Sequence, residues 1–185
     1  LVGSEMCIRD RDLGSDLASD VPVISGDLGN IPFRDESFSF VFSRSVFEHL
    51  AKPDEVLKEF HRILKPGGCC AILTPNRYDY SSIVAALTPQ AFHEFFVRRV
   101  YGETAAYDTY PVLYRANTPG YFRKVASQKA GWKIVQLSGL RHYPANFAFS
   151  RILFRLGIYF DEFIAKMKWT ALQPSLLIVL EKRQS

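Results

Sequence analysis

Apolar and polar positions along the chain follow two periods, one typical of strands and one typical of helices. Short, nearly unbroken apolar runs at residues 21–25, 38–43 and 69–74 predict buried strands. Between the second and third runs, apolar residues recur every three or four positions from Pro53 onward, until Pro66 opens a Pro-Gly-Gly stop signal; this predicts a helix. A helix of this length can cross over between two parallel strands, so we expect an α/β sheet with helices packed on it.

After residue 75 the pattern becomes mainly helical. It predicts helices at 82–87 and 88–102, an irregular stretch at 103–117 and a third helix at 118–131. A strand at 132–140, an amphipathic helix at 147–168 and a last strand at 175–181 follow. The apolar face of the amphipathic helix favours packing in the core or in a lid. The basic residues beside that face, Arg151, Arg155, Lys166 and Lys168, leave an interfacial role open. No apolar run reaches the roughly 20 residues that span a bilayer, so any membrane association is expected to be peripheral.

Composition is typical of a globular protein with one core. The 185 residues are 48% hydrophobic, and the net charge of +4 is mild and unclustered, which argues against a nucleic-acid partner. Cys7, Cys69 and Cys70 fit neither a disulfide framework nor a metal site, so no metal is expected. Because Cys69 and Cys70 lie in an apolar run, we expect buried, reduced thiols and a cytoplasmic location.

The first eleven residues, LVGSEMCIRDR, fit no structural pattern. They resemble the translated read-through of a sequencing adapter, so we interpret residues 1–11 as a non-native segment. Residues 12–185 are then expected to form the C-terminal part of a single domain, without its first strands.

An acidic residue stands where the first predicted strand ends. In open α/β sheets, ligands bind beyond the carboxyl ends of the strands. Asp27 could accept hydrogen bonds there from an amine or a hydroxyl, and Leu28 could offer its backbone N–H and its side chain to a ring. Asp also commonly caps turns, and spacing alone favours the cap, so both alternatives stay open.

A series of short motifs between residues 27 and 76 changes this balance. In chain order they are Asp27, Ile31-Pro32-Phe33, Asp35, Ser37-Phe38, Glu48-His49-Leu50, Pro53, Arg62-Ile63-Leu64-Lys65-Pro66-Gly67-Gly68 and Thr74-Pro75-Asn76. The whole series, in this order and spacing, resembles the second half of the class I S-adenosylmethionine-dependent methyltransferase domain of type 11. Each motif alone is weak, but together they are specific.

The resemblance implies a Rossmann-like α/β sheet of the class I methyltransferase type, lacking its first strands and closed by an antiparallel strand pair. It implies that residues 76–131 form a helical lid insertion. It also implies S-adenosyl-L-methionine as the cofactor. The residues that it assigns to cofactor binding are Asp27 at the adenine amine, Leu28 beside the ring, and Ser43 and Arg44 near the reacting end.

The resemblance also places Glu48 and His49 at the site of methyl transfer. His49 is the candidate catalytic base for an oxygen or nitrogen acceptor, because imidazole titrates near neutrality; a packing role for His49 is the equal alternative. His61, on the predicted crossover helix, is expected to be a surface residue.

The predicted substrate is a small molecule, with lipid, quinone and glycan acceptors all open. Tyr114, Arg115 and Asn117 stand together just before a predicted helix. They could contact an anionic or sugar-bearing substrate, or they could hold a lid together through its own hydrogen bonds.

Two features of the family are absent from this sequence: the glycine-rich loop after the first strand and the acid that binds the ribose hydroxyls. Both contribute to cofactor binding, so we expect the 185-residue chain to bind S-adenosylmethionine weakly and to be inactive alone. Two alternatives stay open, a non-catalytic Rossmann-like binding module and a nucleotide-dependent oxidoreductase. The oligomeric state is open as well.

Overall fold

The structure, a computed structural model, describes residues 26–79, 112–128, 131–140 and 151–184. Its elements are β1 (Phe38–Arg44), α1 (Pro53–Ile63), β2 (Leu64–Pro75), α4 (Pro119–Gln128), β3 (Trp132–Leu140), α5 (Arg151–Lys166), the short 3-10 helix η3 (Thr170–Leu172) and β4 (Ser175–Lys182). The strand predicted at 21–25, the helices predicted at 82–87 and 88–102, and much of the predicted lid lie outside the described residues.

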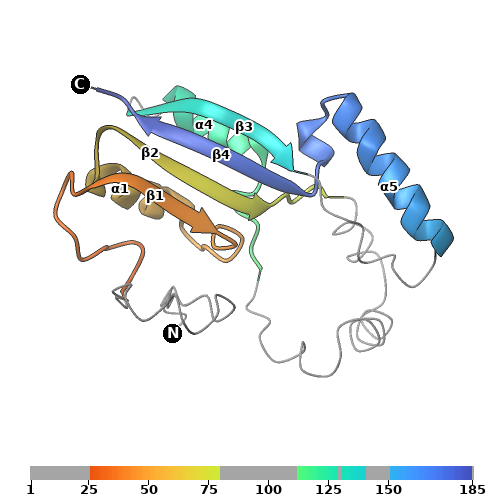
Figure 1. Cartoon of the computed structure of the whole chain (residues 1–185). Coiled ribbons are helices and arrows are strands. Elements are labelled where there is room, and N and C mark those ends of the chain that lie inside the picture. Colours follow the sequence, from red (N-terminus) through yellow and green to blue (C-terminus); the bar gives the residue numbers. More distant parts are fainter. Residues whose placement is uncertain (1–25, 80–111, 129–130, 141–150, 185) are drawn as a thin grey trace, which may run out of the picture.

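The four strands form one mixed sheet in the order β1-β2-β4-β3 (Figure 1). β1 and β2 are parallel and α1 connects them, whereas β4 is antiparallel to both β2 and β3. The predicted crossover and the predicted closing antiparallel pair are therefore confirmed. Because β1 and β2 are parallel, their carboxyl ends meet at one edge of the sheet, where Arg44 pairs with Leu73.

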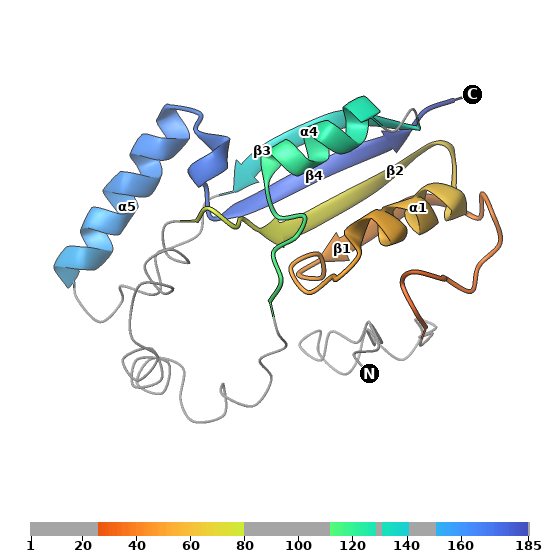
Figure 2. The same cartoon turned by 180° about the vertical axis from the view of Figure 1, so that it is seen from behind.

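The core lies between the sheet and the two helices α1 and α4, which lie on the same face (Figure 2). The strand residues that point into this core are fully or almost fully buried at alternate positions, as the strand period requires: Cys70, Ile72, Leu176, Ile178 and Leu180. On the opposite face the strand residues are less covered, and Phe40 and Phe42 of β1 are 58% and 56% exposed.

Helix α1 begins at Pro53, where a missing N–H costs nothing, and two acidic residues follow in its first turn. It ends at Ile63, before the Pro-Gly-Gly signal, because the next residue is already extended and belongs to β2. The predicted end at Pro66 was therefore too late. The two glycines are needed inside the strand: Gly67 has φ of 77°, and a Cβ at Gly68 would lie 2.9 Å from the Lys65 carbonyl oxygen.

Helix α5 lies beside the end of the sheet rather than in its core (Figure 1). The amphipathic helix predicted at 147–168 is confirmed over Arg151–Lys166, but large parts of its apolar face are exposed. The helix contacts the rest of the molecule through a narrower stripe that includes Gly157 and Ile164. Among the described helices, none is long and apolar enough to cross a membrane.

Candidate functional site at the strand ends

The paired ends of β1 and β2 carry the predicted residues Ser43 and Arg44. Ser43 pairs with Ile72 in the sheet, and Arg44 pairs with Leu73. Arg44 is exposed, whereas Ser43 is buried and its Oγ has no hydrogen-bond partner within the described part of the chain. A buried hydroxyl without a partner is unfavourable and therefore an informative exception in a folded protein. The role of Ser43 in cofactor binding stays a prediction.

Three buried polar side chains, which we call the strand-end cluster, lie just beyond these strand ends. Asn117 Nδ2 donates to Thr74 Oγ1 at 2.5 Å, and Thr74 Oγ1 donates to Glu48 Oε2 at 3.1 Å. Asn117, Thr74 and Glu48 are only 0%, 1% and 5% exposed. Since buried polar groups are stable only when paired, the cluster fixes the loop after β1, the end of β2 and the segment before α4 in one arrangement.

The segment before α4 is also held by the backbone of the turn that carries Glu48. The Tyr114 N–H donates to the Glu48 carbonyl at 3.1 Å, and the N–H of the preceding residue donates to it at 2.7 Å. Arg115 Nη1 donates to the Ala51 carbonyl at 2.9 Å, and Asn117 Nδ2 also donates to the Pro75 carbonyl at 3.0 Å. Arg115 and Asn117 are thus hydrogen-bonded to the loop after β1 and to the end of β2, outside their own segment, so a substrate contact and a lid with internal hydrogen bonds both stay predictions.

His49 lies next to the strand-end cluster. Its Nε2 is 3.9 Å from Glu48 Oε1, and the two side chains are 28% and 7% exposed. The backbone N–H of His49 donates to the Val46 carbonyl at 3.0 Å, which closes the turn. The Glu48 carboxylate therefore bonds the cluster through one oxygen and faces the imidazole with the other, so it can orient a ring that stays accessible to solvent.

Asp27 and Leu28 lie at the beginning of the described chain. The Gly29 N–H donates to Asp27 Oδ1 at 2.8 Å, so the carboxylate does cap its own turn. Asp27 is nevertheless exposed, and the Leu28 side chain is buried in the core cluster. The turn therefore presents a carboxylate to solvent from a backbone that Leu28 anchors.

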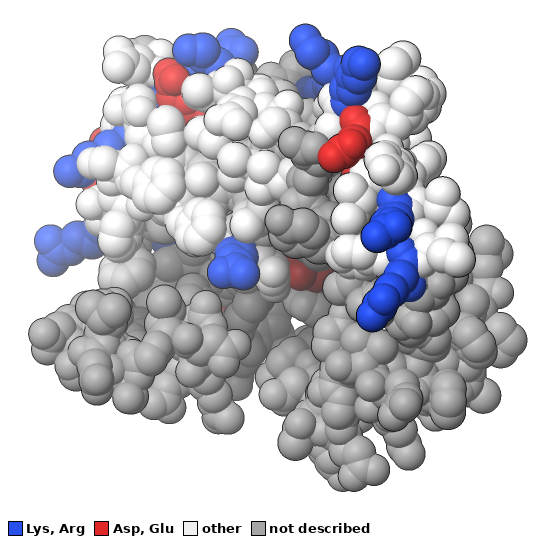
Figure 3. Space-filling model, turned by 45° about the vertical axis from the view of Figure 1, so that its right-hand side comes forward, with Lys and Arg blue, Asp and Glu red and all other residues white. Residues whose placement is uncertain are grey.

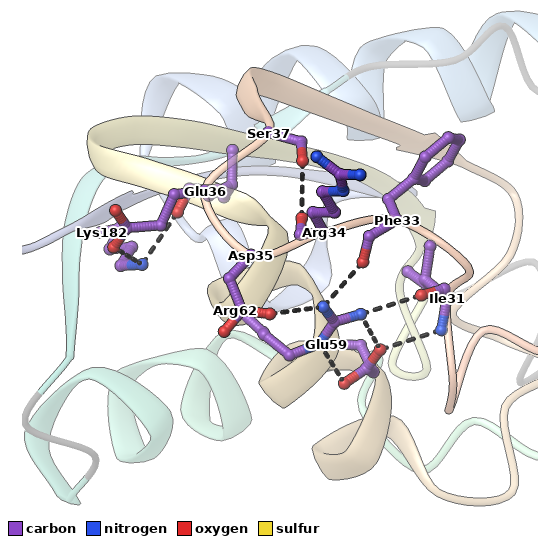
Figure 4. Close-up of polar contacts among 10 residues, drawn as sticks. Ile31, Phe33, Arg34, Asp35, Glu36, Ser37, Glu59, Arg62 and Lys182 are labelled. Atoms are coloured by element: carbon purple, nitrogen blue, oxygen red, sulfur yellow. Dashed lines mark hydrogen bonds and ion pairs between the residues drawn. The ribbon is translucent and has the colours of Figure 1, made fainter.

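Arg62 of α1 holds the loop that follows this turn, and the sequence analysis missed that role. Figure 4 shows its guanidinium among five oxygen acceptors at 2.7–2.9 Å: the carbonyls of Ile31 and Phe33, one Asp35 oxygen and both Glu59 oxygens. The hydrogen bond to Glu59 is the main cause that raises the pKa of Arg62, and the same bond lowers the pKa of Glu59. Asp35, from the first part of the motif series, and Arg62, from the later part, therefore form an ion pair.

Two predictions about α1 and β2 side chains were wrong. His61 is half-buried rather than an exposed surface residue: its ring lies edge-on to Trp132 with the ring centres 5.1 Å apart, and its Nε2 is buried. Burial is the main cause that lowers the pKa of His61, and the charge of Lys182 adds to it. Cys70 is buried as predicted, but Cys69 points to the opposite face of the sheet and is only half-buried, because successive strand residues alternate.

Asn76, the last residue of the motif series, connects β2 to the loop before β4. Its side chain is fully buried, and Nδ2 donates to the carbonyls of Ala171 and Gln173 at 2.7 and 2.9 Å. The polar residues of the Thr-Pro-Asn motif thus have two separate structural roles. Thr74 belongs to the strand-end cluster, and Asn76 fixes the chain that leads into the last strand.

The chain is similar in sequence to known methyltransferases. Residues 3–72 match the family described as "Methyltransferase domain". The chain is 24% identical over 156 residues to a sarcosine/dimethylglycine N-methyltransferase from Aphanothece halophytica, an alignment that covers 83% of this chain and 49% of that protein. It is 31% identical over 111 residues to the ubiquinone/menaquinone biosynthesis C-methyltransferase UbiE of Neisseria meningitidis serogroup C, covering 60% of this chain and 42% of that protein.

A shorter alignment is closer in sequence. Over 48 residues the chain is 50% identical to a demethylmenaquinone methyltransferase from Chlorobaculum parvum, covering 24% of this chain and 19% of that protein. The chain therefore spans about half the length, or less, of these curated relatives. Among solved structures, loganic acid methyltransferase with SAH superimposes with a TM-score of 0.54 at 11% identity, covering 86% of this chain and 66% of that one, a likeness of fold.

Proposed function

We propose that the chain belongs to the class I S-adenosylmethionine-dependent methyltransferases. On this premise, the whole protein transfers a methyl group to a small-molecule acceptor. The reaction takes place at the strand ends of β1 and β2. The observation that carries the proposal is the strand-end cluster. Its three buried side chains hold the Glu48–His49 turn beside the site to which open α/β sheets bind ligands.

The described residues fit one part of the cofactor. Asp27 offers an exposed carboxylate suited to an exocyclic amine, with Leu28 anchored beside it, and Ser43 Oγ is a buried hydroxyl that lacks a partner. When bound, S-adenosylmethionine supplies an electrophilic methyl group on a sulfonium whose leaving group is a neutral thioether. Positioning of the two reactants therefore contributes much of the rate. Ser43 and Arg44 line the site near its reacting end in this proposal.

His49 is the proposed catalytic base. Its imidazole is accessible and lies next to a carboxylate that the cluster holds in place, so it can take a proton from an oxygen or nitrogen acceptor. Glu48 is the proposed positioning residue, since Oε1 faces the ring while Oε2 is bonded to Thr74. A carbon acceptor with an acidic proton would use the same base.

The acceptor is proposed to lie between His49 and the segment before α4. Arg115 is exposed and uses Nη1 for the Ala51 carbonyl, so the rest of its planar guanidinium is suited to an anionic or oxygen-rich acceptor, with Tyr114 beside it. Two named relatives differ in acceptor, one being a sarcosine/dimethylglycine enzyme and one a demethylmenaquinone enzyme. An acceptor panel should therefore include small amines and quinols.

The test measures S-adenosylhomocysteine formation by the full-length protein that contains this chain, with such a panel. We expect His49→Gln to lower kcat by about 100-fold or more while the affinity for S-adenosylmethionine stays unchanged. Glu48→Gln, which keeps an oxygen acceptor for Thr74, should lower kcat less. Lys58→Gln, an exposed change on α1, is the matched control. Wild-type activity in the His49→Gln enzyme would overturn the assignment of the base.

A further inference from the structure

Helix α5 exposes a continuous apolar stripe that covers nothing in the described structure. Six large side chains, five in α5 and one directly after its last residue, are 44–73% exposed: Ile152, Leu156, Tyr159, Phe160, Phe163 and Met167. With about 100° of rotation per residue, they lie within an arc about 100° wide. Gly157, Asp161 and Ile164, which are buried, lie on a separate arc. The apolar stripe is therefore additional to the surface through which α5 packs.

A basic edge borders the apolar stripe. Arg151, Arg155 and Lys166 are exposed and fall on the adjacent arc, where Glu162 is the single exposed acid, and Lys168 follows the last turn. Figure 3 shows the basic side chains as a line along this helix, interrupted by one acidic side chain, next to uncharged surface. An exposed apolar stripe beside a basic edge is typical of helices that lie in a membrane interface.

Helix stability does not account for the two arginines. Positive charge is favourable near the C-terminus of a helix, which suits Lys166, but unfavourable near the N-terminus. The first turn of α5 contains Arg151 and no acidic residue, and Arg155 follows one turn later. The charge of Arg151 therefore acts against the helix dipole, and a negatively charged partner would compensate it. Arg155 lies beyond the first turn and gains nothing from the dipole.

A second copy of α5 is the less suitable partner. In a parallel pair, each basic residue would meet its own equivalent. In an antiparallel pair that sets Arg151 against Lys166, the two ends of the contact would bring these like charges together, although Arg155 would then face Glu162. Either arrangement brings like charges together at an apolar contact, which is unfavourable. An anionic surface has the opposite effect.

The basic surface continues into a shallow hollow between α4 and η3. The hollow has a volume of about 380 Å³, and its lining includes Arg123, Lys168, Trp169 and the residues of η3. Trp169 is 47% exposed, and its ring combines an apolar body with one N–H donor, a property that favours membrane interfaces. Two cations beside an exposed indole suit the phosphate of a lipid headgroup.

We propose that α5 lies in the surface of an anionic membrane, with its apolar stripe among the acyl chains and its basic edge, together with the hollow at Arg123 and Lys168, on the lipid headgroups. The helix lies in the interface and does not span the bilayer. This proposal does not rest on methyl transfer, since none of its residues belongs to the strand-end cluster or to the proposed cofactor and acceptor positions.

The experiment measures sedimentation of the full chain with vesicles of phosphatidylcholine, with and without about 30% phosphatidylserine. We expect binding to the anionic vesicles, decreasing with salt, and a blue shift of tryptophan emission. The chain has two tryptophans, and Trp132 is 2% exposed, so the shift reports on Trp169.

Two variants and two controls separate the outcomes. Arg151→Glu/Arg155→Glu and Leu156→Ser/Phe163→Ser should each weaken binding at least about tenfold, whereas Lys58→Glu/Lys124→Glu on α1 and α4 and Val135→Ser on β3, all exposed positions, should not. Equal binding to neutral and anionic vesicles, or no binding to either, would overturn the proposal. A dimer that Leu156→Ser/Phe163→Ser dissociates, without vesicle binding, would assign the stripe to a second copy instead.

Discussion

The strand-end cluster and helix α5 depart from the usual distribution of polar and apolar groups in opposite ways. The cluster buries a carboxylate, a hydroxyl and an amide, and pairs them with one another. Helix α5 and the residue that follows it expose six large apolar side chains, with basic residues along one edge. Buried polar groups and exposed apolar patches are the informative exceptions in a folded protein. This difference indicates that function is to be sought among the buried side chains of the cluster and on the exposed surface of α5.

The comparison is tested most strongly at Thr74, the middle residue of the cluster. Thr74→Val keeps the shape but leaves Glu48 Oε2 without its donor, and we expect it to lower the free energy of unfolding by about 2 kcal/mol. Urea denaturation with an unchanged m-value measures this effect. Thr74→Ser, which keeps the hydroxyl, is the control. If Thr74→Val is as stable as Thr74→Ser, then the cluster does not hold these loops together.

A second test concerns the Arg62 contacts, which connect a helix to a loop near the site. Lysine keeps the charge but cannot reach the Ile31 and Phe33 carbonyls and Asp35 at once. Arg62→Lys should raise hydrogen exchange at the Ile31 amide, which donates to Glu59, by about tenfold. The amides of β4 should keep their protection, because that strand contacts other residues. Equal changes in both regions would mean that Arg62 stabilises the whole fold rather than the loop.

His61 tests whether burial changes titration on the core face of the sheet. Its pKa is lowered in the folded state, so the unfolded chain binds the proton more tightly. This contribution is present above the ordinary value of 6.5 and is lost as pH falls through 6.5 toward the lower folded pKa. Unfolding free energies at pH 7.5 and pH 5.5 should therefore differ less in His61→Gln than in the wild type. An equal pH dependence in both proteins would contradict the burial of the imidazole.

The smallest effect on stability is expected on α5. Leu156→Ser and Phe163→Ser remove side chains that are 58% and 50% exposed, so each should change the free energy of unfolding by no more than about 0.5 kcal/mol. Thermal unfolding in the absence of lipid measures this. Phe47→Ala, at a core side chain that is 0% exposed, should cost several times more and serves as the reference. A large loss at Leu156 would place the stripe in a contact of the fold and not on a free surface.

Much of the fold could be predicted from local patterns. The strand at 132–140 matches β3, and those at 38–43 and 175–181 each extend by one residue. The helix at 53 begins where Pro53 and the two acids indicate. For the candidate site, the sequence predicted that Ser43 and Arg44 lie at the carboxyl end of a parallel strand, where open α/β sheets bind ligands, and their position is confirmed. Their role in binding stays a prediction. The motif series indicated the methyltransferase family, and the match at residues 3–72 agrees with it.

The sequence by itself determined the order of the elements, the parallel crossover and the resemblance to the methyltransferase family, because these depend on periodicity and on motifs that neighbouring residues carry. Only the tertiary structure decided that Arg62 binds Asp35, that Thr74 joins Glu48 to Asn117, and that the apolar stripe of α5 is exposed. These contacts join residues 26 to 43 positions apart. Their partners are chosen by how the helices and strands pack, and amphipathic periodicity says that a face is apolar but not what covers it.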